Sequence, residues 1–287
     1  MLECFALPEL PEVETMRRGI ASCAGTTIRT IDRPRCRLKP IQIRPLIATL
    51  RKRLYGAQIQ SIERRGKRVV LCTDRDTFLV FEPRMTGLLL LSDPPDTEHL
   101  RLRIGLTRTR QRRSTDLLFW DRRGLGTVQL LSSTEYESLC HGGKLGPDAL
   151  QMTPSLFGKQ LGQSRQAVKV ALLDQKRIAG IGNLYAAEIL LLAGIHPERR
   201  CVDLTDRDWH NVSRATRQVL LKAIRYEGST LGDGTYRNAL NKKGRYQNHH
   251  RVYGREGETC RRCRVAQVLR IVQSQRATFY CPHCQEA

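Results

Sequence analysis

The order of secondary-structure signals along the chain predicts an α+β protein. A helical pattern opens the sequence, short strand patterns follow as far as residue 132, and helical patterns dominate residues 154–227. Strands and helices that are segregated along a chain, rather than alternating, are typical of α+β folds. A closing segment with four closely spaced cysteines predicts a separate metal-binding module.

The first helix is expected over residues 8–22. Pro11 falls in the first turn, where a helix tolerates proline. Val13, Met16 and Ile20 recur at the spacing of one helical face. This spacing predicts an amphipathic helix.

Short strands are expected over most of the next hundred residues. Each is rich in apolar or β-branched residues and is bounded by Gly, Pro or Asp. The predicted strands are 26–32, 57–65, 67–73, 77–83, 87–92, 100–107, 115–121 and 126–132. So many short strands favour a β-sandwich or a barrel.

The pattern becomes helical after the Leu-Gly-Pro stretch at residues 145–147. Thr205 and Asp206 can cap the last of these helices. Residues 228–252 are rich in Gly, Asn, Arg and Tyr and are expected to form a mobile loop. The predicted helices are 154–162, 166–175, 183–194 and 206–227.

Charge and composition restrict the function classes. The 287 residues include 49 Lys and Arg against 28 Asp and Glu, a net charge of +21. Such an excess favours a polyanionic partner, because each cation placed on a phosphate releases counterions. An evenly solvated basic surface is the alternative. No apolar run is long enough for a transmembrane helix, and the first residues lack the features of a secretory signal.

Cysteine spacing gives the most specific signal. Cys260 and Cys263 form one CxxC pair, Cys281 and Cys284 form another, and 17 residues separate the pairs. Two such turns on a hairpin predict a closed four-thiolate site for one structural Zn²⁺. Two unconnected thiol pairs, or a redox pair, are the weaker alternatives. The other six cysteines follow no pattern, which suits a reducing cytoplasm.

Two further features suggest contacts with phosphate. Arg276 is expected at the tip of the zinc hairpin, where a rigidly held guanidinium can bind a backbone phosphate. Gly180 and Gly182 precede a helix that begins at Asn183, and this turn either binds a phosphate or is an ordinary corner between helices. Glu188, on that helix, is expected to order the glycine turn.

Several motifs occur together along almost the whole chain. They are PELPEVET from residue 8, LGPDAL from 145, DQKRIAGIGNLYAAEIL from 174, VYGREGETC from 252 and QRATFYCPHC from 275. The sequence in these stretches resembles the formamidopyrimidine-DNA glycosylases, and PELPEV is closer to them than to the related endonuclease VIII. The resemblance covers residues 8–286.

The resemblance implies an N-terminal helix with a two-layer β-sandwich, a helix–two-turn–helix domain and a Cys4 zinc-finger hairpin. The implied domains are 8–134, 135–252 and 253–287, with residues 1–7 as an extension or a wrongly assigned start. It also implies a monomeric bacterial base-excision repair enzyme of the cytoplasm. Such an enzyme flips 8-oxoguanine or a formamidopyrimidine out of double-stranded DNA and removes it. Alternatives are an endonuclease VIII-like preference for oxidised pyrimidines and a catalytically weak lesion-binding protein.

The resemblance also assigns roles to residues. Pro8 matches the nucleophile that forms a Schiff base with the sugar, after which β,δ-elimination breaks the strand. Glu9 matches the general acid/base, and Lys67 and Arg276 match groups that contact phosphate near the reacting centre.

Other matches concern the grip on DNA. Met85 and Arg123 match residues that fill the gap left by the flipped base, and Leu125 stands where the family has Phe. Thr97 stands near where the family has His, so the family's opposite-base selectivity is not expected to carry over unchanged. The loop 241–246 matches a mobile loop over the flipped base. Additional expected DNA contacts are Arg165, Lys169, Asn183 and Tyr253.

The position of Pro8 raises a chemical difficulty. An internal proline nitrogen is an amide, whose lone pair is delocalised, so it cannot attack a sugar. One hypothesis is that translation starts at Leu7, read as Met, whose removal exposes Pro8. Trimming to Pro8 is a second. The third is that the extension is real, and another amine such as Lys67 acts or the protein only binds lesions.

Overall fold

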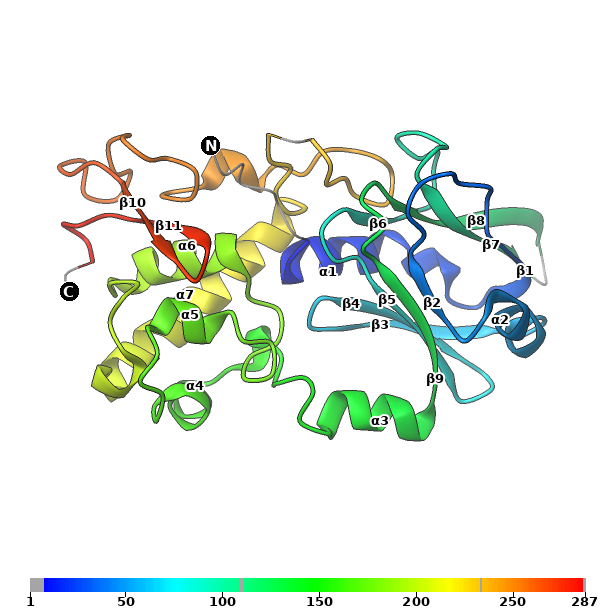
Figure 1. Cartoon of the computed structure of the whole chain (residues 1–287), viewed down its shortest axis with the longest axis horizontal. Helices are drawn as coiled ribbons and strands as arrows, with labels where there is room; N and C mark the ends of the chain where they lie inside the picture. The colour runs from blue at the N-terminus through cyan, green and yellow to red at the C-terminus, as the bar shows by residue number, and fades with distance from the viewer. Residues whose placement is uncertain (1–7, 109–110, 233, 286–287) are drawn as a thin grey trace.

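Two β-sheets stacked face to face form the N-terminal half of the molecule (Figure 1). The computed structural model describes residues 8–108, 111–232 and 234–285, so the expected extension at residues 1–7 lies outside the described residues. One sheet has the order β1 (Thr27–Asp32), β7 (Leu100–Arg108), β8 (Gln111–Asp121) and β6 (Gly87–Leu90).

The second sheet lies across the first. Its order is β2 (Gln42–Arg44), β9 (Thr127–Ser132), β5 (Thr77–Glu82), β4 (Arg68–Thr73) and β3 (Ile59–Arg65). All its described pairings are antiparallel except β2 with β9. The expected sandwich is confirmed, because both sheets bury one face in a shared apolar core.

Helix α1 (Leu10–Gly19) joins this core to the helical half. Val13, Met16 and Ile20 belong to the sandwich core, whereas Leu10 belongs to the core of the helical half. The helix begins two residues later than expected, because Glu9 is its N-cap and forms a capping box with Glu12. A separate 3-10 turn over Ala21–Cys23 replaces its expected last turn.

Two helices and one strand of the N-terminal half were not predicted. Helix α2 (Ile47–Leu54) buries only Leu50 and Leu54, and β2 has just three residues. Helix α3 (Ser133–His141) buries only Tyr136, whose ring stacks on Phe78. With so few apolar positions, neither helix produces a clear periodicity. The expected domain boundary at residue 134 falls inside α3.

Four helices build the other half, and one of them, α6, is central and buried over residues 184–191. Helix α6 packs against α7, and α4 packs against α7. Thr205 caps α7 through a capping box with Asp208, as its sequence position suggested. The expected helix 166–175 shrinks to five residues. The bounds are α4 (Pro154–Leu161), α5 (Val168–Leu172), α6 (Asn183–Ala193) and α7 (Asp206–Arg225).

The segment after α7 crosses back to the sandwich. Tyr236 and Ala239 are buried in the sandwich core, and the Ala239 carbonyl accepts a hydrogen bond from the Leu91 N–H at 2.9 Å. A short 3-10 helix occupies Tyr246–His249. The described part of the expected loop is therefore anchored in both cores, by Tyr236 and Ala239 in one and Tyr246 in the other, although residues 242, 243 and 245 are exposed.

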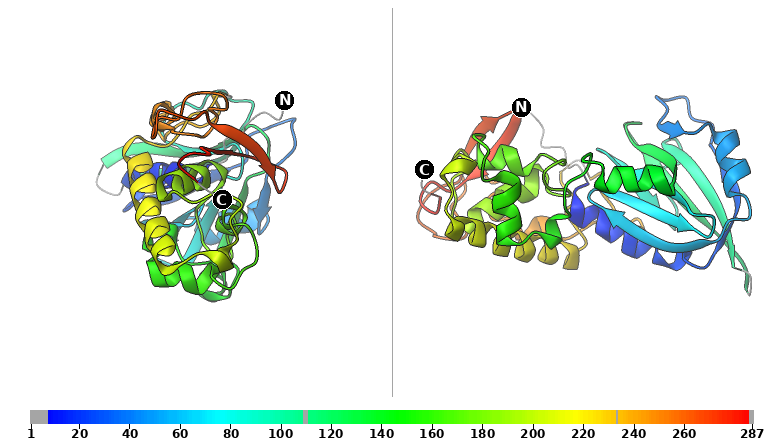
Figure 2. Two further views of the ribbon diagram at one scale, coloured as in Figure 1. Left: turned by 90° about the vertical axis from the view of Figure 1, so that its left-hand side faces the viewer. Right: turned by 90° about the horizontal axis from the view of Figure 1, so that it is seen from below.

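The chain ends in a two-stranded hairpin, β10 (Leu269–Gln273) and β11 (Arg276–Tyr280). Ala277 and Phe279 place β11 against α6 in the core of the helical half. Figure 2 shows the hairpin rising from the helical half on the same side as the segment between β1 and β2. Among the described helices, none has the length and apolarity that crossing a membrane requires.

Candidate active site

The carboxylate of Glu9 sits on the N-terminus of α6. It accepts hydrogen bonds from the Gly182 N–H at 2.6 Å and the Leu184 N–H at 3.0 Å. These donors form the positive end of the helix dipole, which favours an anion. The close approach of Glu9 depends on glycine at position 182, because a Cβ there would overlap the Glu9 carboxylate.

The carboxyl group of Glu9 has a pKa close to neutral pH. Burial raises the pKa of Glu9 to about 7, although the charge of Lys67 and the two backbone donors oppose this rise. Burial lowers the pKa of Lys67, which Glu9 raises and Arg276 lowers further. A carboxyl group with a pKa near 7 can both give and take a proton at physiological pH, as general acid/base catalysis requires.

A second carboxylate, Glu12, fixes the backbone around the buried Pro8–Glu9 pair. Its Oε2 accepts from the Glu9 N–H at 3.0 Å, and its Oε1 accepts from the Tyr185 hydroxyl at 2.6 Å and the Ser229 N–H at 2.9 Å. Burial raises the pKa of Glu12. Glu12 therefore ties the backbone of Glu9, next to the buried Pro8, to α6 and to the segment that follows α7.

The glycine turn before α6 connects the two halves of the molecule. It leaves little room for a phosphate at the N–H groups of Gly182 and Leu184, which already bind Glu9. The Gly180 carbonyl accepts from the Leu10 N–H at 3.0 Å, and Gln175 accepts from the Gly180 N–H at 2.9 Å. Gly180 has φ +113°, and a Cβ there would meet Leu10. Glu9 already occupies the N–H groups of Gly182 and Leu184, so an internal carboxylate stands where a phosphate was one expectation.

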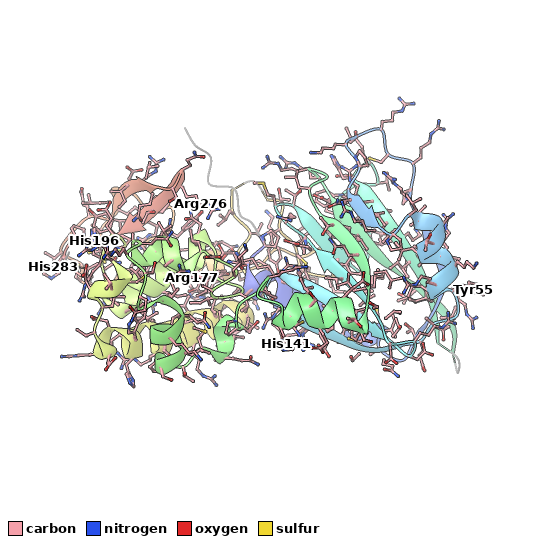
Figure 3. All side chains as sticks on the ribbon, turned by 60° about the horizontal axis from the view of Figure 1, so that its bottom comes forward. Tyr55, His141, Arg177, His196, Arg276 and His283 are labelled. Atoms are coloured by element: carbon pink, nitrogen blue, oxygen red, sulfur yellow. The ribbon has the colours of Figure 1, made fainter. Side chains whose placement is uncertain are left out.

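Lys169 connects α5, α6 and the zinc hairpin. Its buried ammonium donates to Asn183 Oδ1 at 2.6 Å and to Thr278 Oγ1 at 2.7 Å. The Asn183 amide in turn donates to the Ala277 carbonyl at 3.0 Å. Burial, with help from Arg276, lowers the pKa of Lys169 to about 8. Arg276 is exposed at the start of β11 (Figure 3), near enough to Lys169 for their charges to interact.

The three residues expected to fill the DNA gap lie on two adjoining turns. The buried Asp121 holds the turns together, accepting from the Thr86 hydroxyl and from the Gly126 N–H at 2.7 Å. The Arg123 N–H donates to Thr86 Oγ1 at 2.9 Å. Met85 and Leu125 are half-buried on these turns, and the side chain of Arg123 is exposed.

Other expected residues lie differently. Arg165 is exposed in the turn before α5. Tyr253 is buried, with its ring against Phe279. Thr97 is exposed, two residues from His99, which contacts Asp96.

The expectation for Glu188 was wrong. Its carboxylate accepts the N–H groups of Arg251, Val252 and Tyr253 at 2.9 to 3.0 Å and so orders that segment, not the glycine turn. The N-terminus of α6 contacts the glycine turn, whereas Glu188 lies further along the helix on a face that contacts residues 251–253.

The four cysteines of the hairpin module converge as predicted. All four Sγ atoms lie within 4.8 Å of one another. Cys260 and Cys284 are 4.0 Å apart, and Cys263 and Cys281 are 3.7 Å apart. Tetrahedral zinc with Zn–S bonds near 2.3 Å needs sulfur atoms about 3.8 Å apart. The donor set therefore fits one closed, structural Zn²⁺ site.

Sequence reasoning missed three residues that organise the site. Glu12 could have been found from its capping-box spacing to Glu9. Asp121 stands next to the predicted Arg123, but nothing local marks it as buried. Thr278 gives no sequence signal, because its partner Lys169 is 109 residues away.

Sequence comparison identifies three domains. The formamidopyrimidine-DNA glycosylase N-terminal domain matches residues 7–128, and the H2TH domain of the same enzyme matches residues 145–234. A zinc finger found in Fpg and isoleucyl-tRNA synthetase matches residues 257–287.

Relatives match over nearly their whole length. Formamidopyrimidine-DNA glycosylase of Chloroflexus aggregans is 38% identical, covering 97% of this chain and 98% of its own. The Gluconobacter oxydans enzyme is 36% identical, with coverage of 98% and 100%. A Lactococcus lactis Fpg variant bound to Fapy-dG DNA superposes with a TM-score of 0.84 at 34% identity, covering 98% and 100%. A complex of Lactococcus lactis Fpg with abasic-site DNA gives 0.84 at 33% identity, covering 97% and 100%.

Proposed function

The chain belongs to the formamidopyrimidine-DNA glycosylase family, and on this premise we propose that it excises oxidised purines from duplex DNA and then cleaves the abasic strand. The observation that carries the proposal is the Pro8–Glu9 pair on the N-terminus of α6. It combines a buried carboxyl of pKa about 7 with a proline whose amine, once free, can act as a nucleophile.

The chemistry follows from these groups. The lone pair of a free Pro8 amine attacks C1′, the bond from C1′ to the damaged base breaks, and the base takes up the proton that the Pro8 nitrogen loses. The C1′–O4′ bond then opens as the iminium forms, and Glu9 supplies the proton that O4′ takes up. Loss of a C2′ proton releases the 3′-phosphate, and loss of the C4′ proton releases the 5′-phosphate by δ-elimination. Water then hydrolyses the iminium, which frees the Pro8 amine and the sugar fragment.

The cations around the pair suit the phosphates on either side of the damaged nucleotide. Arg276 is exposed, and Lys67 is half-buried near enough to Glu9 for their charges to interact. Lys169 acts through Asn183 and Thr278, which fix α6 against the zinc hairpin. We propose that Lys67, Asn183 and Arg276 grip the backbone while Met85, Arg123 and Leu125 occupy the gap.

The preferred lesion is open between two classes. Family membership favours oxidised purines, such as 8-oxoguanine and formamidopyrimidines. A Lactococcus lactis Fpg 33% identical to this chain has been solved with oxidised-pyrimidine DNA, so the second candidate, an endonuclease VIII-like preference, has a specific observation behind it. Competition between 8-oxoguanine and thymine-glycol duplexes separates the two.

Cellular context and assembly follow from the same reasoning. The relatives are bacterial, and the cysteines of the zinc site need a reducing compartment to stay as thiolates. We propose that the protein acts as a monomer on double-stranded DNA in the cytoplasm. Sedimentation of the protein with and without a lesion duplex tests the stoichiometry.

Borohydride trapping on an 8-oxoguanine:C duplex tests the function. The 287-residue chain is compared with a chain that begins Met–Pro8 and with its Glu9→Gln variant. A covalent adduct from the shorter chain alone identifies Pro8 as the nucleophile. Equal adducts from both chains, with residues 1–7 intact by mass, assign the chemistry to another amine such as Lys67. If no chain forms an adduct, the enzyme proposal fails and lesion binding alone remains.

A further inference from the structure

A segment with four exposed cations links β1 to β2. This basic arm, residues 33–39, has the sequence RPRCRLK and contains no helix or strand. In the described part of the chain, no ion pair or hydrogen bond is formed by the side chains of its four cations, Arg33, Arg35, Arg37 and Lys39. Side chains of this segment project away from the sandwich (Figure 3).

The basic arm is nevertheless fixed at its centre. Arg101, whose side chain is buried, donates to the sulfur of Cys36 and to the carbonyls of Asp121 and Arg122. The Cys36 thiol donates to the Glu98 carbonyl at 3.1 Å. One buried guanidinium thus holds the arm to the turn that carries Arg123.

The end of the arm touches the same turn. Gly124 has φ +62°, and a Cβ at this position would overlap the carbonyl oxygen of Lys39. The backbone of the arm is therefore in direct contact with the residue that follows Arg123. Any duplex that receives Arg123 lies beside the arm.

The arm also lines a hollow suited to an anion. A cavity of about 280 Å³ is bounded by Arg33, Arg35 and Arg101, with no carboxylate among its lining residues. Three arginines and no acidic residue in the lining favour an anion such as phosphate, for which arginine is well suited.

We propose that the basic arm binds backbone phosphates of the DNA strand opposite the damaged base. The proposal rests on the proposed function, because the strand is assigned from Arg123, which is expected to face the opposite base. The arm would extend the DNA contact from that turn along the partner strand. It contributes affinity and orientation without reading sequence.

Salt dependence of binding tests the proposal. Binding of the Met–Pro8 chain to an 8-oxoguanine:C duplex is measured by fluorescence anisotropy between roughly 50 and 200 mM salt, where each lost phosphate contact lowers the slope of log K against log salt by about 0.9. The test variant replaces the four arm cations by Gln. The control replaces four exposed cations of α4 and α7, Lys159, Arg207, Arg214 and Arg217, and so removes the same charge.

In the arm variant, the negative slope of log K against log salt should be less steep than in the control, by about 0.9 or more. An arm variant whose slope matches the control overturns the proposal, and the single Arg35→Gln variant gives the same comparison if the fourfold variant does not fold. Methylphosphonate linkages in the strand opposite the lesion should weaken the parent and leave the arm variant unaffected. Equal weakening of both overturns the strand assignment. If the parent forms no adduct and shows no preference for the lesion, the proposed function fails instead.

Discussion

Gly182→Ala should disable the reaction with little harm to the fold. The backbone at residue 182 has φ −131° and ψ −163°, which alanine adopts without strain. The added Cβ would overlap the Glu9 carboxylate. Relief of this overlap has to move Glu9, which breaks its hydrogen bonds to the Gly182 and Leu184 N–H groups.

The size of the effect follows from the role of Glu9. Loss of a positioned general acid/base costs about 10²- to 10⁴-fold in rate, which is about 3 to 5 kcal/mol of activation free energy. The lost cap on α6 costs folding about 1 to 2 kcal/mol. Single-turnover cleavage of an 8-oxoguanine:C duplex by the Met–Pro8 chain measures the first effect, and thermal unfolding measures the second.

Gly158→Ala is the matched control. Gly158 lies inside α4, and a Cβ there would make ordinary contact with Trp209 at 3.7 Å. This change should stabilise the protein by up to about 1 kcal/mol and leave the rate unchanged. If Gly182→Ala cleaves as fast as the parent, the placement of Glu9 on α6 does not govern catalysis and the reasoning is refuted.

Further predictions concern pH, metal and the DNA-facing turns. Glu9→Gln should remove an inflection near pH 7 from the pH profile of kcat/KM; a profile that keeps it would assign that proton to another group. Because the folded pKa of Glu9 is raised, its stabilising contribution is present below about pH 4.5 and is lost as pH rises through about 7; urea unfolding of Glu9→Gln should show less loss of stability across that window. Chelation of zinc should lower the melting temperature and abolish DNA binding, because β11 supplies the Ala277 and Thr278 partners of Asn183 and Lys169; unchanged binding after confirmed metal loss would contradict this. Asp121→Ala should reduce discrimination between opposite bases more than it reduces binding, measured on duplexes with C, A, G or T opposite the lesion.

Local signals explain what the sequence could predict. The zinc site depends on two short spacings, and the strands and long helices depend on apolar periodicity, so both were visible. Helices α2 and α3 were not predicted because each buries only one or two apolar side chains. The longer strands and helices were therefore more predictable than the short elements α2, α3 and β2.

For the candidate site, prediction from sequence is limited because the properties of its residues depend on contacts with distant segments of the chain. The family motifs indicated Glu9, Lys67 and Arg276, yet the pKa of Glu9 depends on burial and on Lys67, 58 residues along the chain. Glu188 was assigned to the wrong partner because its nearest sequence neighbours are not its contacts. Asp121 and Thr278 act through hydrogen bonds between distant segments, which residue type alone does not reveal.

Helix α1 has a consequence for how the molecule unfolds. Leu10 is part of one apolar core, and Val13, Met16 and Ile20 are part of the other. Tyr236 and Ala239 reach back into the sandwich core from beyond α7. If one half unfolds, the other loses apolar contacts from its own core. Calorimetry should therefore record a single unfolding transition for both halves. The proposed nucleophile and its acid/base partner, at the start of α1, would then lose their native surroundings in that same transition.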